Sequence, residues 1–137
     1  MVRFFALMAV AILVAASTSV ANAASGWGWM RGSALSEFTE VDWETLKTQI
    51  GLALDEYADG QQLDWMNPDS GSGGSIKPLS TFEHNSQTCR RIAIRNVTRK
   101  GVKGGGVYNL CQQDNGEWMF VTESEIKTAE AATAPGE

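Results

Sequence analysis

The chain has 137 residues with two cysteines and one histidine, and its formal net charge is −5 at pH 7. This length is enough for one modest hydrophobic core, and a domain of this size gains from a cross-link. A single histidine excludes a metal site built from several histidines, and no apolar run after residue 23 is long enough to span a membrane.

Residues 1–23 predict a secretory signal peptide. Arg3 gives a positive start, residues 4–16 are an uninterrupted apolar run, and Ala21 and Ala23 occupy the small-residue positions of a cleavage site. We therefore expect an exported chain that begins at Ala24, where no cysteine offers a site for lipid attachment. In an exported protein, two cysteines most simply form a disulfide.

Residues 24–38 mix tryptophan and methionine with glycine and serine, and we expect an extended arm that covers an edge of the core. Residues 40–59 predict a helix. Thr39 and Asp42 form an approximate capping box at its start, and Gly60 can take the left-handed conformation that ends a helix. The apolar residues of this segment recur every three or four positions and would share one face: Trp43, Leu46, Ile50, Leu54 and Tyr57.

After this helix the apolar period changes to two. The pattern predicts antiparallel strands over 63–67, 75–84, 90–97, 106–113 and 117–122. Pro78 cannot donate to a sheet ladder, so the second strand should lie at an edge or bend there. Residues 123–137 are acidic and rich in alanine and threonine, and we expect a frayed helix or disorder.

These elements predict an α+β domain over residues 39–122. One N-terminal helix would pack on a curved antiparallel sheet of four to five strands, in a cystatin-like arrangement. The expected core consists of Trp43, Leu46, Ile50, Leu54, Trp65, Ile92, Ile94, Leu110, Trp118 and Phe120.

Cys89 and Cys111 bracket a segment with six basic residues and no acidic residue. If the two cysteines lie opposite each other in an antiparallel pair, a three-residue loop falls on residues 99–101, and Gly101 supplies the positive φ that such a loop needs. Both thiols then point to the same face, within reach of each other. The sequence thus predicts a Cys89–Cys111 disulfide, which would stabilise the domain by about 3 kcal/mol.

The basic residues of this hairpin form a row. Arg91, Arg95 and Arg99 fall on one face, with Lys100 and Lys103 at the turn. Our hypothesis is that this row contacts an anionic component of the cell envelope. The alternatives are that the acidic helix or tail neutralises the row, or that water simply solvates it.

No catalytic constellation emerges from the sequence. His84 lies at a predicted strand end, where a solvated turn histidine is expected rather than a general base. A pair of thiols in an exported chain predicts a structural disulfide rather than a nucleophile. We therefore expect no enzymatic activity, no cofactor, no metal site and no nucleic-acid partner, and the oligomeric state stays open.

Three ordered motifs, DWMNPDSGSGGSIKP, CRRI and LCQQDNGEW, resemble the C-terminal domain of the seventeen-kilodalton bacterial surface-antigen family, over about residues 50 to 120. In that pattern a Trp-x-Asn-Pro segment precedes a glycine-rich turn and a proline-containing strand, and a Cys-Arg pair, a second cysteine and a Gly-x-Trp follow. The matching positions are Trp65, Asn67, Pro68, Gly71, Gly74, Pro78, Cys89, Arg90, Cys111, Gly116 and Trp118.

The resemblance implies a location in the cell envelope and implies no particular chemistry. Family members often carry a lipoprotein cysteine and a glycine-zipper segment. Here the helix over 40–59 takes that place, which favours a free periplasmic or secreted form over outer-membrane anchoring. We expect a non-catalytic, exported cell-envelope module for binding or structure. The alternative is an inhibitor or accessory subunit of an envelope enzyme, acting through a loop such as 67–75, and a small hydrolase comes third.

Overall fold

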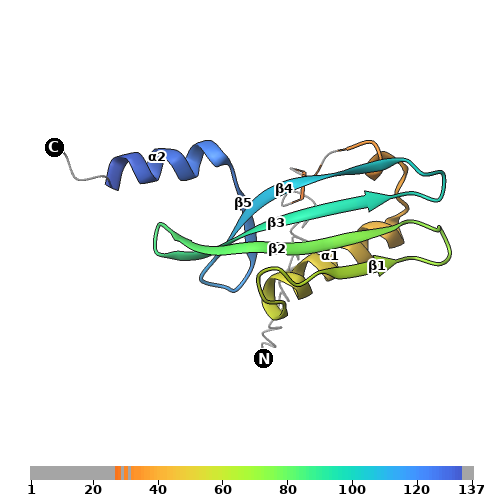
Figure 1. Ribbon diagram of the computed structural model, residues 1–137, viewed down its shortest axis with the longest axis horizontal. Helices are drawn as coiled ribbons and strands as arrows, with labels where there is room; N and C mark the ends of the chain where they lie inside the picture. The colour runs from red at the N-terminus through yellow and green to blue at the C-terminus, as the bar shows by residue number, and fades with distance from the viewer. Residues whose placement is uncertain (1–26, 29, 31, 134–137) are drawn as a thin grey trace, which may run out of the picture.

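The structure is a computed structural model that describes residues 27–28, 30 and 32–133, so the predicted signal peptide and its cleavage site lie outside the described residues. The elements in chain order are the 3-10 helix η2 (Leu35–Glu37), α1 (Glu40–Glu56), β1 (Leu63–Met66), β2 (Gly73–His84), β3 (Gln87–Val97), β4 (Lys103–Gln112), β5 (Trp118–Val121) and α2 (Glu123–Thr133). The strands form one antiparallel sheet in the order β1-β2-β3-β4-β5 (Figure 1).

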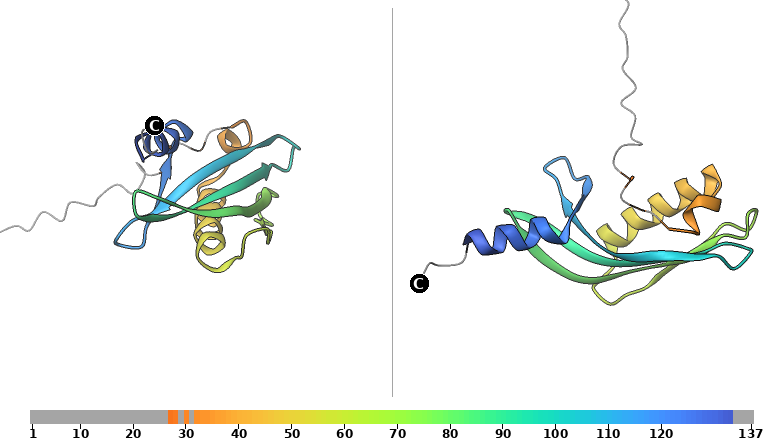
Figure 2. Two further views of the ribbon diagram at one scale, coloured as in Figure 1. Left: turned by 60° about the vertical axis from the view of Figure 1, so that its left-hand side comes forward. Right: turned by 90° about the horizontal axis from the view of Figure 1, so that it is seen from above.

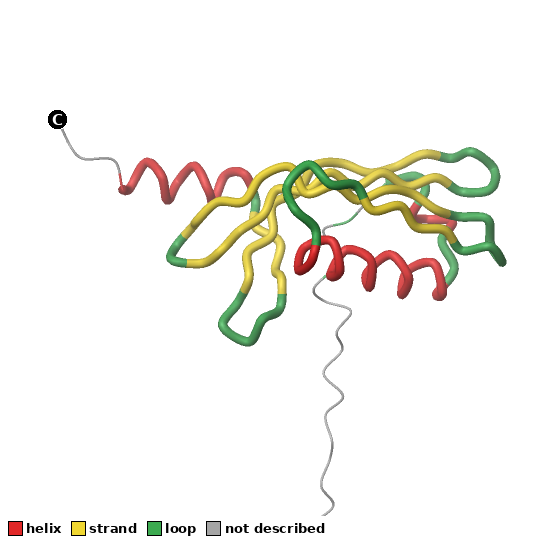
Figure 3. The backbone as a smooth tube through the Cα atoms, turned by 60° about the horizontal axis from the view of Figure 1, so that its bottom comes forward, coloured by secondary structure: helices red, strands yellow, loops and turns green. Residues whose placement is uncertain are grey.

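Helix α1 packs on one face of this sheet, which curves around it (Figure 2), and α2 extends from the end of the sheet opposite the β3–β4 turn (Figure 3). The α+β prediction, one main helix on an antiparallel sheet of four to five strands, is confirmed. The further helix α2 lies where the sequence left a frayed helix or disorder open.

The start of α1 was predicted correctly and its end was not. The Thr39 hydroxyl accepts a hydrogen bond from the Asp42 N–H, and the Asp42 carboxylate accepts one from the Thr39 N–H, which completes the capping box. The helix stops at Glu56, because Tyr57 is already extended. Gly60 has the expected positive φ of 88°, but it lies beyond the helix, where its N–H donates to the Pro78 carbonyl.

The core lies between α1 and the sheet face that α1 covers. Of the predicted core residues, Trp43 and Trp118 are only partly buried and pack against the cluster, and Phe120 is partly buried because β5 is a short edge strand. Prediction missed several core members from the arm and from the first strands. The buried hydrophobic cluster consists of Met30, Leu35, Leu46, Ile50, Ala53, Leu54, Leu63, Trp65, Ile76, Ile92, Ile94 and Leu110.

Pro78 does not lie in an edge strand, since β2 is flanked by β1 and β3. The second part of that expectation is confirmed, because the β2–β3 register shifts between Pro78 and Ser80. A two-residue turn, Asn85 and Ser86, joins these strands, and both residues have positive φ. Such a turn matches the twist of a hairpin, so β3 begins three residues earlier than predicted.

The ends of the described chain are more ordered than the sequence suggested. The arm is not simply extended, because it forms η2 and places Met30 and Leu35 in the core. Helix α2 begins with a capping box that the sequence analysis missed: Thr122 N–H donates to the Glu125 carboxylate, and Glu125 N–H donates to the Thr122 hydroxyl.

Candidate functional site

The loop between β1 and β2 is tied to the start of α1 by a buried carboxylate. Asp42 is fully buried, and its Oδ1 accepts hydrogen bonds from Asn67 Nδ2 at 2.7 Å and from Ser70 Oγ at 2.6 Å. Burial alone would raise the pKa of Asp42, but the hydrogen bonds from Ser70, Thr39 and Asn67 outweigh it and hold the pKa below its usual value. The asparagine of the Trp-x-Asn-Pro motif therefore fixes the loop to the helix.

The other end of α1 is held by a buried guanidinium. Arg90 Nη1 donates to the carbonyl oxygens of Ala53 at 3.2 Å and Leu54 at 2.7 Å, in the last turn of α1. Its Nη2 donates to Asp59 Oδ1 at 2.8 Å, and this bond holds the pKa of Asp59 below its usual value. The arginine of the Cys-Arg pair thus supplies a donor to the Leu54 carbonyl and a second donor to the Ala53 carbonyl, which also accepts from the Tyr57 N–H.

Cys89 and Cys111 form the predicted disulfide, with both residues fully buried. They lie opposite each other in the β3–β4 register, with Arg91 opposite Asn109, as the sequence predicted. Gly101 in the turn has φ 81°. The disulfide and the contacts of Asn67 and Arg90 with α1 and its flanking loop show that these motif residues hold the helix and the sheet together.

We call the face of the sheet that points away from α1 the outer face. Side chains opposite each other in neighbouring strands share a face, so two rows of the outer face can be read from the register. One row runs across the four strands through Asp64, Ser75, Arg95 and Gly105, and the next through Met66, Gly73, Val97 and Lys103. Because Gly73, Ser75 and Gly105 have little or no side chain, the middle of the outer face forms a depression.

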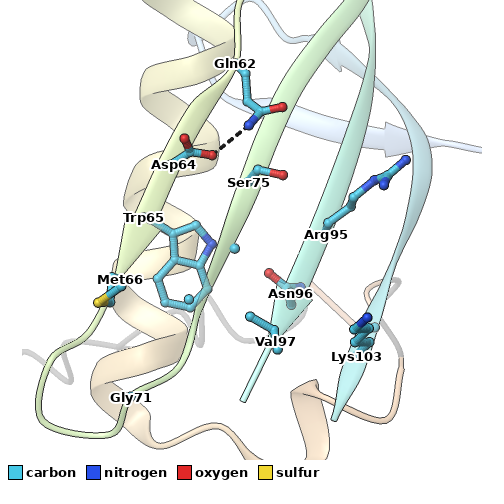
Figure 4. A pocket seen from close by; sticks show the side chains of 13 residues that line it. Gln62, Asp64, Trp65, Met66, Gly71, Ser75, Arg95, Asn96, Val97 and Lys103 are labelled. Carbon is cyan, nitrogen blue, oxygen red and sulfur yellow. Dashed lines mark hydrogen bonds between the residues drawn. The ribbon is translucent and has the colours of Figure 1, made fainter. Parts of the chain in front are cut away.

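A groove of about 630 Å³ follows these rows (Figure 4). Two cations line it, Arg95 from β3 and Lys103 from β4, and neither forms an ion pair within the described part of the chain. The acid in the groove is Asp64, which already accepts a hydrogen bond from Gln62 Nε2 at 2.8 Å. Exposed Met66 adds an apolar side chain. The groove can therefore accept an anionic group at its basic side.

The rest of the predicted basic row is divided among other contacts. Arg91 donates to Glu123 of α2 at 3.2 Å, with both side chains about half exposed. Glu123 also accepts from Asn109 Nδ2 at 2.9 Å, and these contacts lower the pKa of Glu123, the bond from Asn109 most of all. Neutralisation by the acidic tail, one of the alternatives open in the sequence, therefore holds for this one arginine.

Arg99 lies at the edge of the groove, and Lys100 points towards the arm. Arg99 lies against Gly71, whose positive φ of 75° and missing side chain make room for it. The Lys100 ammonium lies 4.0 Å from the Glu37 carboxylate of the arm, a distance at which an exposed pair contributes little. The structure therefore brings together Arg95 and Lys103 and separates them from Arg91 and Lys100.

Local sequence patterns did not indicate the contacts that fix the β1–β2 loop to α1 or the small residues that form the floor of the groove. Asp42 was interpreted only as a capping residue, and its partners follow 25 and 28 residues later, which no local pattern indicates. His84 was expected to be solvated, and it is buried beside Asn85, with the first turns of α2 lining the same hollow. Among the residues that the structure describes, no group of histidine, cysteine and carboxylate side chains could hold a metal ion.

The loop expected to protrude as an inhibitor element divides into two parts. Residues 73–75 belong to β2, and the remaining residues fold back through backbone hydrogen bonds between Asn67 and both Gly71 and Ser72. Within the described ranges, no helix is long and apolar enough to cross a membrane.

Comparison with known proteins matches residues 53–119 to the family described as 17 kDa outer membrane surface antigen. The 17 kDa surface antigen of Rickettsia prowazekii (strain Madrid E) is 30% identical over 83 residues, which are 60% of this chain and 52% of that protein. Those of Rickettsia conorii (strain ATCC VR-613 / Malish 7) and Rickettsia bellii (strain RML369-C) are 31% and 30% identical over 70 residues, 50% of this chain and 43% of each relative. The chain spans about half the length of the curated relatives it matches. No solved structure matches it significantly.

Proposed function

We propose that the protein is an exported, non-catalytic module of the cell envelope that binds an anionic component, and the match of residues 53–119 to the family described as 17 kDa outer membrane surface antigen supports the envelope part of this proposal. The family description supports the envelope location. The proposal includes export through the predicted signal peptide. N-terminal sequencing of material from the envelope should then find Ala24 first, and a chain that still starts at Met1 would contradict export by this route.

One observation carries the binding proposal: Arg95 and Lys103 share a groove in which no acidic side chain pairs with them. Elsewhere the charge is strongly segregated, since residues 35–64 contain eight acids and one lysine. A chain with net charge −5 repels anions as a whole, so it can bind one only where its cations are grouped apart from its acids. The groove is such a place.

The contacts of the motif residues support a non-catalytic role. Asn67 and Arg90 use their polar groups on α1, and both cysteines are bonded to each other. A catalytic site would need a nucleophile or base with converging polar groups in a pocket. The groove offers cations, one carboxylate and exposed apolar surface, which is a composition suited to recognition.

The test is binding to a soluble polyanion, heparin, as salt is raised. The double variant R95E/K103E should bind much more weakly than the parent, and parent binding should weaken with salt because exposed charges are screened. The matched control is K47E/K127E, which makes the same change in net charge on α1 and α2. Equal loss in both variants would mean that net charge alone matters and would overturn the groove as the site.

The same variants address the alternative of an inhibitor or accessory subunit. Stoichiometric capture of one envelope enzyme, unaffected by R95E/K103E, would favour that alternative over binding of an anionic component.

A further inference from the structure

The outer face exposes large apolar side chains beside its free cations. Met66 is 73% exposed, Val107 50% and Val97 37%. Met66 and Val97 lie in the row that contains Lys103, and Val107 lies opposite Ala93 in the row beyond Arg95. Figure 4 shows Met66 on β1 at one edge of the groove, Lys103 on β4 at the other, and Val97 on β3 between them.

This combination narrows the chemistry of the partner. A soluble polyanion can pair with the cations, but it has no apolar surface to bury the exposed methionine and valine side chains. A lipid surface can bind both kinds of side chain, since anionic headgroups attract the cations and the interfacial region accepts apolar side chains. Burial of apolar area is favourable at about 25 cal/mol per Å², so three such side chains strengthen docking independently of charge.

The distribution of acidic residues gives the docking an orientation. The exposed acids of α1 lie on the opposite side of the sheet from the groove. On the outer face, Glu123 is already engaged by Arg91 and Asn109, and Asp64 accepts a hydrogen bond from Gln62, so three cations face one carboxylate without a cationic partner among the described residues. Lys77 adds a third cation to the outer face, opposite Ala93. An anionic membrane would therefore attract this face and repel the α1 side.

We propose that the outer face docks on the surface of an anionic lipid bilayer, with Arg95, Lys103 and Lys77 at the headgroups and Met66, Val97 and Val107 in the interfacial layer. This inference rests on the proposed function, because it names the anionic component that the groove binds. The chain lies on the membrane through one face of its sheet.

The experiment is co-sedimentation with vesicles that contain about 30% phosphatidylglycerol in phosphatidylcholine, compared with pure phosphatidylcholine. The parent should bind only the anionic vesicles. Each basic side chain near an anionic surface contributes about fivefold in affinity, so R95E/K103E should lose at least about 25-fold.

A second variant separates lipid from other anions. M66S/V107S removes the apolar contacts and keeps every charge, so it should lose vesicle binding, most clearly at about 0.5 M salt, and retain heparin binding. V41S/L52S is the matched control, since these residues are also exposed but lie on α1. All four substituted positions are on the surface, and melting curves should confirm that both variants remain folded.

The outcomes distinguish this inference from the proposed function. If the parent binds heparin but no vesicles, or if M66S/V107S binds vesicles like the parent, lipid docking is wrong and the anionic partner is a polymer or a protein. If the parent binds neither probe, the proposed function fails as well.

Discussion

Arg90 and Arg91 are neighbours in the sequence, but they should contribute very differently to stability. Arg90 is 93% buried and donates three hydrogen bonds, two of them to carbonyls in the last turn of α1. Arg91 lies on the other face of the sheet in a half-exposed ion pair with Glu123. Replacing each by methionine keeps the aliphatic stem and removes only the polar group.

The expected cost follows from these contacts. A hydrogen bond from a charged donor contributes about 1.5–3 kcal/mol, and its loss leaves the Leu54 carbonyl without this donor, whereas the Ala53 carbonyl keeps the Tyr57 N–H. The Asp59 side chain is 40% exposed, so we discount that part of the interaction to at most about 1 kcal/mol. The Ala53 and Leu54 carbonyls dominate, and R90M should lower the free energy of unfolding by about 3–5 kcal/mol. R91M should lower it by less than about 1 kcal/mol.

Urea unfolding of both variants with the disulfide intact measures this difference. R90K provides an intermediate case, because an ammonium keeps the charge but lacks the planar fork that serves several acceptors. If the free energies of unfolding of R90M and R91M differ by less than about 1 kcal/mol, the hydrogen bonds of Arg90 contribute little and our account of how α1 is held is wrong.

Three further predictions concern the disulfide, the buried Asp42 carboxylate and two glycines. Replacing Cys89 and Cys111 together by serine should cost about 2–4 kcal/mol, and thiol titration of the unfolded, unreduced parent should detect no free thiol. Because the pKa of Asp42 is lowered in the folded state, its ionised form stabilises the fold above the ordinary aspartate pKa, and this contribution is lost as the pH falls through the folded value. The stability difference between the parent and D42N should accordingly shrink as the pH falls from about 6 to about 2, and a constant difference would contradict the assignment. G74A should strongly destabilise the fold because the added Cβ meets a backbone carbonyl of β3, whereas G51A, with open space around it in α1, should stabilise by about 0.5–1 kcal/mol; similar melting temperatures for the two would refute this.

The register of β3 against β4 was predictable because the two cysteines fix it. Once Cys89 is placed opposite Cys111, every pair from Arg91 with Asn109 to the turn at Gly101 follows by counting. The start of α1 was also predictable, because the capping contacts between Thr39 and Asp42 lie within one turn. Such features depend on neighbours in the chain or on one covalent constraint.

The contacts that shape the site were not predictable in this way. The sequence placed Arg91 and Arg95 in one row, but it could not indicate that Glu123, the first residue of α2 beside β5, contacts only one of them. Thr122 and Glu125 form a capping box that marks the start of α2 in the sequence. The alanine-rich, acidic composition of the segment nevertheless led us to expect a frayed helix or disorder. Tertiary placement thus decided which cations stay available.

The match to the family description begins at Ala53, inside α1 rather than at its start. A fragment cut at that boundary would retain the carbonyls that Arg90 binds but would lose Leu46 and Ile50, which fill the space between helix and sheet. It would also lose Asp42, the anchor of the β1–β2 loop. The unit that folds is therefore longer than the segment from 53 to 119, and a chimera between this chain and a Rickettsia antigen should be joined before Thr39, so that helix and sheet come from the same parent.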